Sequence, residues 1–153
     1  MAVHALFLNT VEDLGFFEND STDCHICQMQ HARLTMAVIS SRRISGLLHS
    51  LPESPDRDGC EIDLQLALAV CLLTAEGAVA AKLPYMRAFD LAESSGAPQQ
   101  RFEALYGVWQ STNMSGGSAA ASPLSARLLS MTEQERDDGL RLQAHHSAWS
   151  TWA

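Results

Sequence analysis

Apolar residues recur at helical spacing along most of the chain. Positions i, i+3, i+4 and i+7 fall on one face of an α-helix, whereas Val, Ile, Tyr and Thr nowhere alternate with polar residues as they would in a strand. The sequence therefore predicts an all-α protein. Segments rich in Gly, Pro, Ser or Asp separate the helical stretches. The predicted helices cover approximately residues 23–50, 59–75, 80–95, 98–112, 121–135 and 139–152.

The N-terminal end differs in composition from the rest. Residues 1–22 contain Glu12, Asp13, Glu18 and Asp20 and no basic residue. We expect either a loosely packed helix or a frayed tail in this segment. Residues 23–153 then form one helical domain, in keeping with a total length of 153 residues.

One motif occurs three times along the chain. The segments 64–71, 102–109 and 142–149 align without gaps, at offsets of 38 and 40 residues. Repeats with a period of roughly 20–50 residues are typical of stacked helical arrays. We expect one face of each copy to pack against neighbouring helices. These faces are Leu64, Ala67, Leu68 and Cys71, then Phe102, Leu105, Tyr106 and Trp109, then Leu142, His145, His146 and Trp149.

A second helix follows each of the first two copies, and residues 88–91 match residues 128–131 at the same offset of 40. The unit is therefore an antiparallel helical hairpin, with hairpins at about 59–95 and 98–135 and a partial third repeat at 139–152. A hairpin alone cannot cover both apolar faces, so we expect the hairpins to stack as a short right-handed solenoid. Small residues at Ala69, Gly107 and Ser147 would let its first helices approach closely.

The order of these segments resembles a known family. LPESPDR at 51–57, DLQLAL at 63–68, AFDLAESSG at 88–96 and QAHHSAW at 143–149 are similar to the tetratricopeptide-like repeat region of large bacterial signalling proteins. Those proteins join a class III adenylate/guanylate cyclase domain, or a winged-helix DNA-binding domain, to a signal-transduction P-loop ATPase. The resemblance covers about residues 41–152. It implies a tetratricopeptide-like solenoid that serves signal transduction through protein–protein interaction.

The chain also departs from that family. Residues 1–37 show no clear similarity, no cyclase or ATPase module is present, and Pro84 lies where the family runs a regular helix. The sequence stops inside the first helix of its third repeat. The resemblance therefore implies a fragment of a repeat array, without the enzymatic activity of the whole signalling proteins.

The formal net charge of −8 narrows the choice of partners. Nucleic acid and anionic lipid both attract clustered basic residues, so we expect the protein to bind neither. The longest apolar run, residues 64–74, is shorter than the roughly 20 residues of a membrane-spanning helix. The first residues lack the basic start of a signal peptide. We therefore expect a cytoplasmic protein whose four cysteines are free thiols.

One group of residues has the spacing of metal ligands. Cys24 and Cys27 form a C-x2-C pair, and His31 would share their helical face. Structural zinc needs four ligands, and the remaining cysteines, Cys60 and Cys71, are isolated in the sequence. We expect these cysteines to be buried packing residues, and no metal or other cofactor.

His145 and His146 are the other candidates for chemistry. Adjacent residues on a helix point about 100° apart, so the two rings cannot bind one ion from a regular helix. We expect them to pack against a neighbouring helix. No nucleophile or phosphate-binding motif is present, so the sequence predicts a protein that is not an enzyme.

Polar residues beside small ones on the first helices predict a shallow groove. Gln65, Glu103 and Gln143 occupy one column, and Gln110 lies in the next. Such a groove can hydrogen-bond an extended or helical peptide. The leading hypothesis is a non-enzymatic interaction or regulatory module that binds a protein partner. The alternatives are a sensory part of a nucleotide-cyclase or ATPase-linked signalling complex, and a vestigial fragment without activity.

The C-terminal end is rich in apolar residues. Leu142, Trp149 and Trp152 lie there, and no second helix follows them in the sequence. Large exposed apolar patches usually mark contact surfaces. We expect this end either to pack back onto the helix at 23–50 or to form a homodimer through Trp149 and Trp152.

The incomplete ligand set gives a first prediction. Protein purified without added metal should contain no stoichiometric zinc in elemental analysis, because Cys24, Cys27 and His31 supply three ligands and not four. One equivalent of zinc that disappears in the Cys24→Ser variant would contradict it.

Overall fold

The computed structural model describes residues 24–48, 50, 54–95, 98–133 and 137–152, with side chains between residues 32 and 151. Every element in these ranges is an α-helix and none is a strand, so the all-α prediction is confirmed. None of these described helices has both the length and the hydrophobicity to cross a membrane. The helices are α2 (Cys24–Leu48), α3 (Pro55–Ala75), α4 (Ala78–Ser95), α5 (Pro98–Met114), α6 (Ser118–Thr132) and α7 (Asp138–Trp152).

The helix bounds lie close to the predicted ones, with the largest shift at the start of α3. Ser54 is the N-cap of this helix, and its side-chain oxygen accepts a hydrogen bond from the backbone N–H of Arg57 at 3.2 Å. Pro55 occupies the first helical position, where its missing N–H costs nothing. The Pro-containing segment that predicts a loop up to residue 58 thus supplies the first turn of α3.

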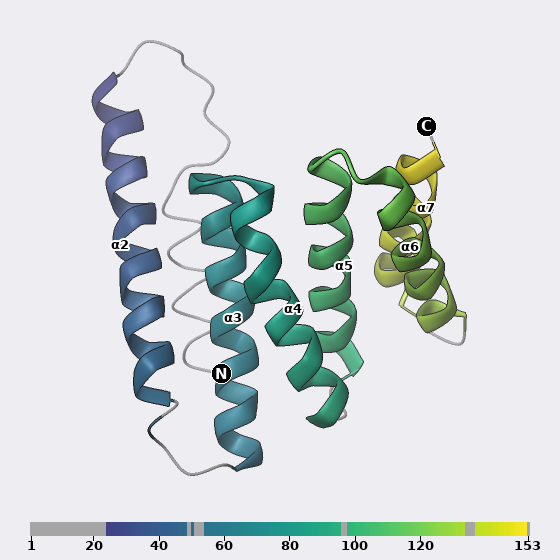
Figure 1. Cartoon of the computed structure of the whole chain (residues 1–153), viewed down its shortest axis with the longest axis horizontal. Helices are drawn as coiled ribbons and strands as arrows, with labels where there is room; N and C mark the ends of the chain where they lie inside the picture. Colours follow the sequence, from purple (N-terminus) through teal and green to yellow (C-terminus); the bar gives the residue numbers. More distant parts are fainter. Residues whose placement is uncertain (1–23, 49, 51–53, 96–97, 134–136, 153) are drawn as a thin grey trace.

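The helices lie side by side in the order of the chain (Figure 1). Each packs against the next, and α3 also contacts α5, as α5 contacts α7. Short connections such as Glu76-Gly77 make successive helices antiparallel. α2 and α7 lie at opposite ends of the row. The expectation that the C-terminal end packs back onto the helix at 23–50 is therefore wrong, because α3 to α6 separate the two helices.

Helix bounds and buried positions repeat every 40 residues. α4 and α6 begin at Ala78 and Ser118, and α5 and α7 begin at Pro98 and Asp138. The side chains that these helices bury follow the same spacing. Ile62, Leu64, Leu68 and Cys71 of α3 correspond to Phe102, Ala104, Val108 and Ser111 of α5, and Ala81, Tyr85 and Ala88 of α4 correspond to Ala121, Ser125 and Leu128 of α6.

This spacing corrects the sequence alignment of the first two copies. Similarity of residue types pairs Leu64 with Phe102, but the buried positions pair Ile62 with Phe102. Each residue turns an α-helix by about 100°, so a shift of two residues brings nearly opposite faces together. The offset of 38 is therefore wrong, whereas the offset of 40 between the second and third copies agrees with the structure.

The packing face predicted for the third copy is also wrong. Leu142, His145 and Trp149 are exposed on α7. The helix buries Ala144 and Ser147 instead, together with Thr151. These three lie on the opposite side of α7, because they differ from the predicted face by two residues.

Two turns of the chain repeat in the same way. Gly77 ends α3 with φ +93°, and Gly116 follows α5 with φ +79°. Residues other than glycine avoid this left-handed region. The N–H of Gly77 donates to the carbonyl of Leu72 at 2.9 Å, and the N–H of Gly117 donates to the carbonyl of Thr112 at 3.1 Å. Each turn thereby satisfies a carbonyl left open at a helix end.

Proline interrupts neither of the two helices that contain it. Pro84 lies inside α4 and Pro123 inside α6. Proline lacks the N–H that would bond to the previous turn and bends a helix, and α4 changes direction part-way along its length (Figure 1). The near-equivalent positions of the two prolines make Pro84 a feature shared by both second helices of this chain.

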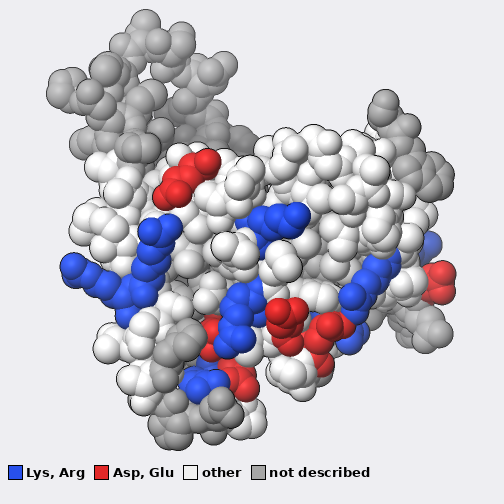
Figure 2. Space-filling view, viewed as in Figure 1, with Lys and Arg blue, Asp and Glu red and all other residues white. Residues whose placement is uncertain are grey.

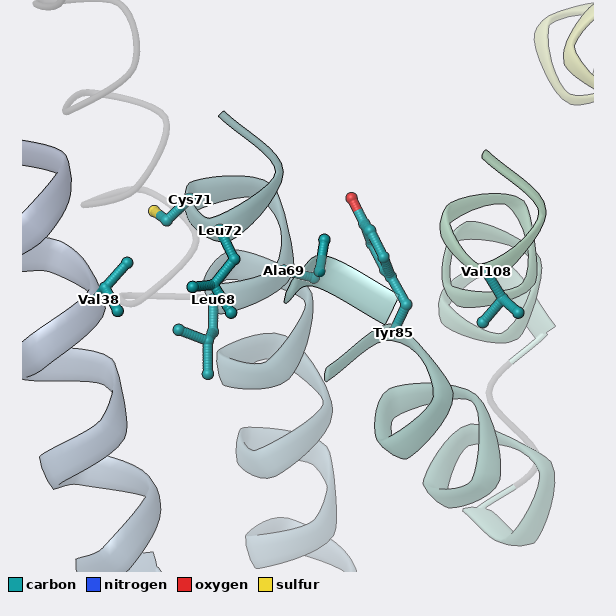
Figure 3. Packing of buried hydrophobic residues seen from close by; sticks show 8 residues of the cluster. Val38, Leu68, Ala69, Cys71, Leu72, Tyr85 and Val108 are labelled. Carbon is teal, nitrogen blue, oxygen red and sulfur yellow. The ribbon is translucent and has the colours of Figure 1, made fainter. Parts of the chain in front are cut away.

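The core of the first four helices is centred on α3. Figure 3 shows Leu68 and Leu72 on the side of α3 that faces Val38 of α2, and Ala69 on the side that faces Tyr85 of α4. Burial raises the pKa of Tyr85 to about 12, with a smaller contribution from the neighbouring Cys71. α3 is therefore packed on two sides.

A buried ion pair joins α3 to α4. Glu61 is 1% exposed, and one of its carboxylate oxygens accepts a hydrogen bond from Nε of Arg87 at 2.7 Å. That hydrogen bond raises the pKa of Arg87 above its usual value. Because the carboxylate of Glu61 is removed from water, loss of its partner would leave an uncompensated buried charge.

Gly107 marks the closest approach between α5 and α4. A Cβ atom at this position would overlap the ring of Tyr85. The sequence predicts a close contact here between first helices, but the neighbour is a second helix. A flat aromatic ring lies against the glycine because no side chain holds the helices apart.

The contact predicts a specific cost for one added methyl group. Gly107→Ala should lower the free energy of unfolding by about 1–3 kcal/mol, because the Tyr85 ring must move out of a packed core. Gly59→Ala in α3 is the control: no atom lies within 4 Å of its added Cβ, and alanine should stabilise that helix by about 0.5–1 kcal/mol. Urea denaturation measures both. Equal stability of Gly107→Ala and the wild type would contradict the contact.

Candidate functional site

The exposed sides of α3, α5 and α7 form the candidate site. At the 40-residue spacing, Asp63, Glu103 and Gln143 correspond, and Glu103 and Gln143 are exposed. A second set of corresponding residues is Leu66, Tyr106 and His146, and a third is Val70, Gln110 and Ser150. We call these nine residues the α3–α5–α7 surface.

Gln65 does not belong to this surface. It is 8% exposed, and its side-chain nitrogen donates to the hydroxyl of Ser45 in α2 at 3.3 Å. The groove predicted from Gln65, Glu103, Gln110 and Gln143 therefore loses its first member to the α2–α3 interface. Asp63 takes that place in the column.

Two polar contacts hold the three helices in register. Oδ1 of Asp63 accepts a hydrogen bond from the side-chain amide of Gln100 at 2.5 Å, which joins α3 to α5. Oη of Tyr106 lies 3.2 Å from Nδ1 of His146, which joins α5 to α7. The second contact connects residues that occupy equivalent positions 40 residues apart. Burial raises the pKa of Tyr106, so its hydroxyl keeps its proton through the neutral range.

Glu103 and Gln110 belong to α5. The carboxylate of Glu103 accepts a hydrogen bond from Gln99 one helical turn earlier, at 3.2 Å. This bond is exposed, so the carboxylate stays open to a further donor. Gln110 is half-buried. The structure thus brings Glu103, Gln110 and Gln143 to one surface, as the sequence predicts.

His146 links three polar side chains. Its Nε2 atom lies 3.2 Å from the hydroxyl of Ser150, while Nδ1 contacts Tyr106. A hydroxyl, an imidazole and an orienting group in this order resemble a nucleophile with its base. However, Ser150 lies inside α7, where its backbone N–H is bonded within the helix and cannot stabilise an oxyanion. The three side chains therefore act as a polar link between α5 and α7.

The histidines separate as their spacing predicts. His146 packs against α5, with its ring 5.9 Å from the ring of Trp109 in an edge-on arrangement. His145 is exposed. The expectation that both rings pack against a neighbouring helix thus holds for His146 and is wrong for His145.

Trp109 anchors α7 to α5 beneath this surface. Its side chain is 3% exposed, and Nε1 donates to the hydroxyl of Thr151 at 2.8 Å. The same hydroxyl donates to the carbonyl of Ser147 at 2.7 Å. Phe102, Leu105 and Leu128 complete the cluster around the indole. Burial of Trp109, predicted from the helical face of the second copy, is confirmed.

Metal-binding residues do not come together in the described part of the chain. The side chains of Cys24, Cys27 and His31 lie outside the described side chains. Among the side chains that are described, no three of His, Cys, Asp or Glu could hold an ion. Cys60 is an exposed free thiol, and Cys71 is a buried one whose pKa burial raises.

A small cavity lies where α5 begins. It measures about 220 Å³ and is lined by the first turn of α5 and by Met131, Thr132, Asp137 and Leu140. Pockets for drug-sized ligands usually measure about 300–1,000 Å³. The oxygen of Asp137 that could face a ligand already accepts the backbone N–H of Gly139 at 2.8 Å. The extended surface is therefore the stronger candidate.

The residues that sequence reasoning missed are Asp63, Tyr106, His146 and Ser150. Glu103 and Gln143 were found because they are polar and align at the offset of 40. The same offset applied to α3 leads from Glu103 to Asp63 and from Tyr106 to Leu66. The spacing of Gly77 and Gly117, also 40 residues, was the signal for it.

No protein-family model, no curated protein and no solved structure matches the chain.

Trp109 gives a prediction with an internal control. Trp109→Ala should lower the free energy of unfolding by about 3–5 kcal/mol, the usual cost of a large cavity in a core. Thr151→Val should cost about 1–3 kcal/mol, because it leaves the buried indole N–H without an acceptor. Trp149→Ala should change stability by less than about 0.5 kcal/mol, since Trp149 is 77% exposed. Denaturant titration compares the three variants, and a loss below about 1 kcal/mol for Trp109→Ala would contradict the packing.

Proposed function

We propose that this protein is a non-enzymatic interaction module that binds a protein or peptide partner along the α3–α5–α7 surface. One observation carries the proposal. Equivalent polar positions on consecutive first helices lie on one surface, and the contact between Tyr106 and His146 fixes α5 and α7 in register. A regular series of hydrogen-bonding groups suits a ligand that extends across several helices.

The residues of this surface indicate the chemistry of the partner. Neighbouring packed helices lie about 8–10 Å apart, so groups on α3, α5 and α7 recur at distances that suit a peptide more than a small molecule. Glu103 and Asp63 carry negative charge, while Gln143 offers both a donor and an acceptor. The matching ligand is a peptide with Lys or Arg side chains beside free backbone amide groups.

A solenoid of helical hairpins is the arrangement that this function uses. The 40-residue spacing of helix bounds, buried positions and turns supports it. Arrays of this kind bind partners across the exposed sides of several repeats. The resemblance to tetratricopeptide-like regions of bacterial signalling proteins supports the same role, because such regions act through contacts with other proteins.

Reversing one charge tests the proposal. Partners captured by the immobilised chain from a lysate of its own source are identified, and their dissociation constants are measured by calorimetry for the wild type and for Glu103→Lys. The affinity should fall at least about tenfold, equivalent to 1.4 kcal/mol, because Glu103 is proposed to face basic groups of the ligand.

A matched control separates this effect from net charge. Asp90→Lys makes the same charge change on the exposed side of α4, outside the proposed surface. Its affinity should equal that of the wild type. Equal affinities for Glu103→Lys, Asp90→Lys and the wild type would remove the α3–α5–α7 surface as the binding site.

A further inference from the structure

The outer side of α7 is uncovered. Leu142 is 72% exposed and Trp149 is 77% exposed, and His145 and Asp138 lie on the same side of the helix. We call these four residues the open face of α7. It is one of the places where the described structure leaves a large aromatic side chain in water.

The chain itself shows what normally covers this face. At the 40-residue spacing, Leu142, His145 and Trp149 correspond to Phe102, Leu105 and Trp109 of α5. Those three residues are almost completely buried in the cluster that α5 forms with α6 and α7. The open face of α7 thus has the shape of an interface that receives a following antiparallel helix of the kind of α4 or α6.

The other end of the row offers such a helix. α2 places Ser41, Ser45 and Leu48 against α3, as α4 places Ala81, Tyr85 and Ala88 in its own buried face. α2 therefore occupies the position of a second helix in the repeat.

α2 also has an uncovered edge. Ile44 corresponds to Pro84, which α4 buries between its neighbours α3 and α5. Ile44 is 48% exposed, because in the described structure α2 has α3 as its packing neighbour. We call Ala37, Ile44 and Leu48 the open edge of α2.

Charge favours contact between these two ends. α2 contains Arg33, Arg42 and Arg43 and no acidic residue. Figure 2 shows blue side chains projecting from the side of the molecule that α2 forms. Around the start of α7, the described acidic residues are Glu133, Asp137 and Asp138, against one arginine, Arg141. In a protein of net charge −8, two copies therefore repel least when the α2 end of one meets the α7 end of the other.

We propose that copies of this chain associate head to tail, with the open face of α7 covered by the open edge of α2 from a second copy. The contact continues the row of helices with the same alternation and the same antiparallel neighbours as within one chain. It is heterologous, so each copy keeps one free end and association can continue beyond two copies. The proposal uses the ends of the row and is independent of the α3–α5–α7 surface.

Sedimentation velocity over a range of concentrations tests the proposal. The wild type should form species larger than a dimer as concentration rises. Trp149→Glu removes the α7 face and Ile44→Glu removes the α2 edge, so each variant alone should lose assembly at least about tenfold in affinity. Both side chains are largely exposed, so both variants should retain the circular dichroism of the wild type.

Mixing the two variants gives the decisive result. The Trp149→Glu copy keeps an intact α2 edge and the Ile44→Glu copy keeps an intact α7 face, so an equimolar mixture should form a one-to-one complex that does not grow further. Leu83→Glu, at an exposed leucine of α4, is the control and should assemble as the wild type does.

Several outcomes would overturn the proposal. A symmetric contact between two α7 faces would leave the Ile44→Glu variant dimeric and stop at two copies. A monomeric wild type at about 0.5 mM, or a mixture of the two variants that stays monomeric, would also refute it, since contacts weaker than about 1 mM are negligible in this assay. None of these outcomes bears on partner binding at Glu103, which is measured separately.

Discussion

The constraint on which this fold depends is that each helix inside the row must bury two sides, because it has a neighbour on each side. α5 shows this most clearly. Ala104 and Val108 pack toward α4 and α3, while Phe102, Leu105 and Trp109 pack toward α6 and α7. What remains for water is a narrow strip that carries Glu103 and Gln110. The position of the candidate site is therefore a consequence of packing.

This constraint explains how much could be predicted. Helix number and bounds follow from apolar spacing and from Gly, Pro and Ser breaks, and the structure agrees with them. The identity of the buried face was harder, because a helix buried on two sides has apolar residues at too many positions for one face to stand out. Leu64 and Ile62 are both buried, so residue type alone could not decide which of them corresponds to Phe102. The site inherited that error at Gln65, a polar residue that α2 covers.

The interior is built differently at the two ends of the row. Around α3 it consists of Leu68, Leu72 and other aliphatic side chains. Around α6 and α7 it includes the hydroxyl groups of Ser125, Ser147 and Thr151, which donate to backbone carbonyls of their own helices at 2.7–2.8 Å. Such bonds satisfy the hydroxyl groups but contribute little apolar burial.

α7 is consequently attached by fewer apolar contacts than the helices before it. Trp109 supplies much of that attachment through its ring and through its hydrogen bond to Thr151. Any helix that covers Leu142 and Trp149 would bury apolar surface on the side of α7 that is now in water, and would stabilise α7 by mass action. Because Tyr106 contacts His146 on that same helix, association at the end of the row would also hold the α5–α7 part of the binding surface in place. In this way, two separate surfaces would be coupled through the stability of one helix.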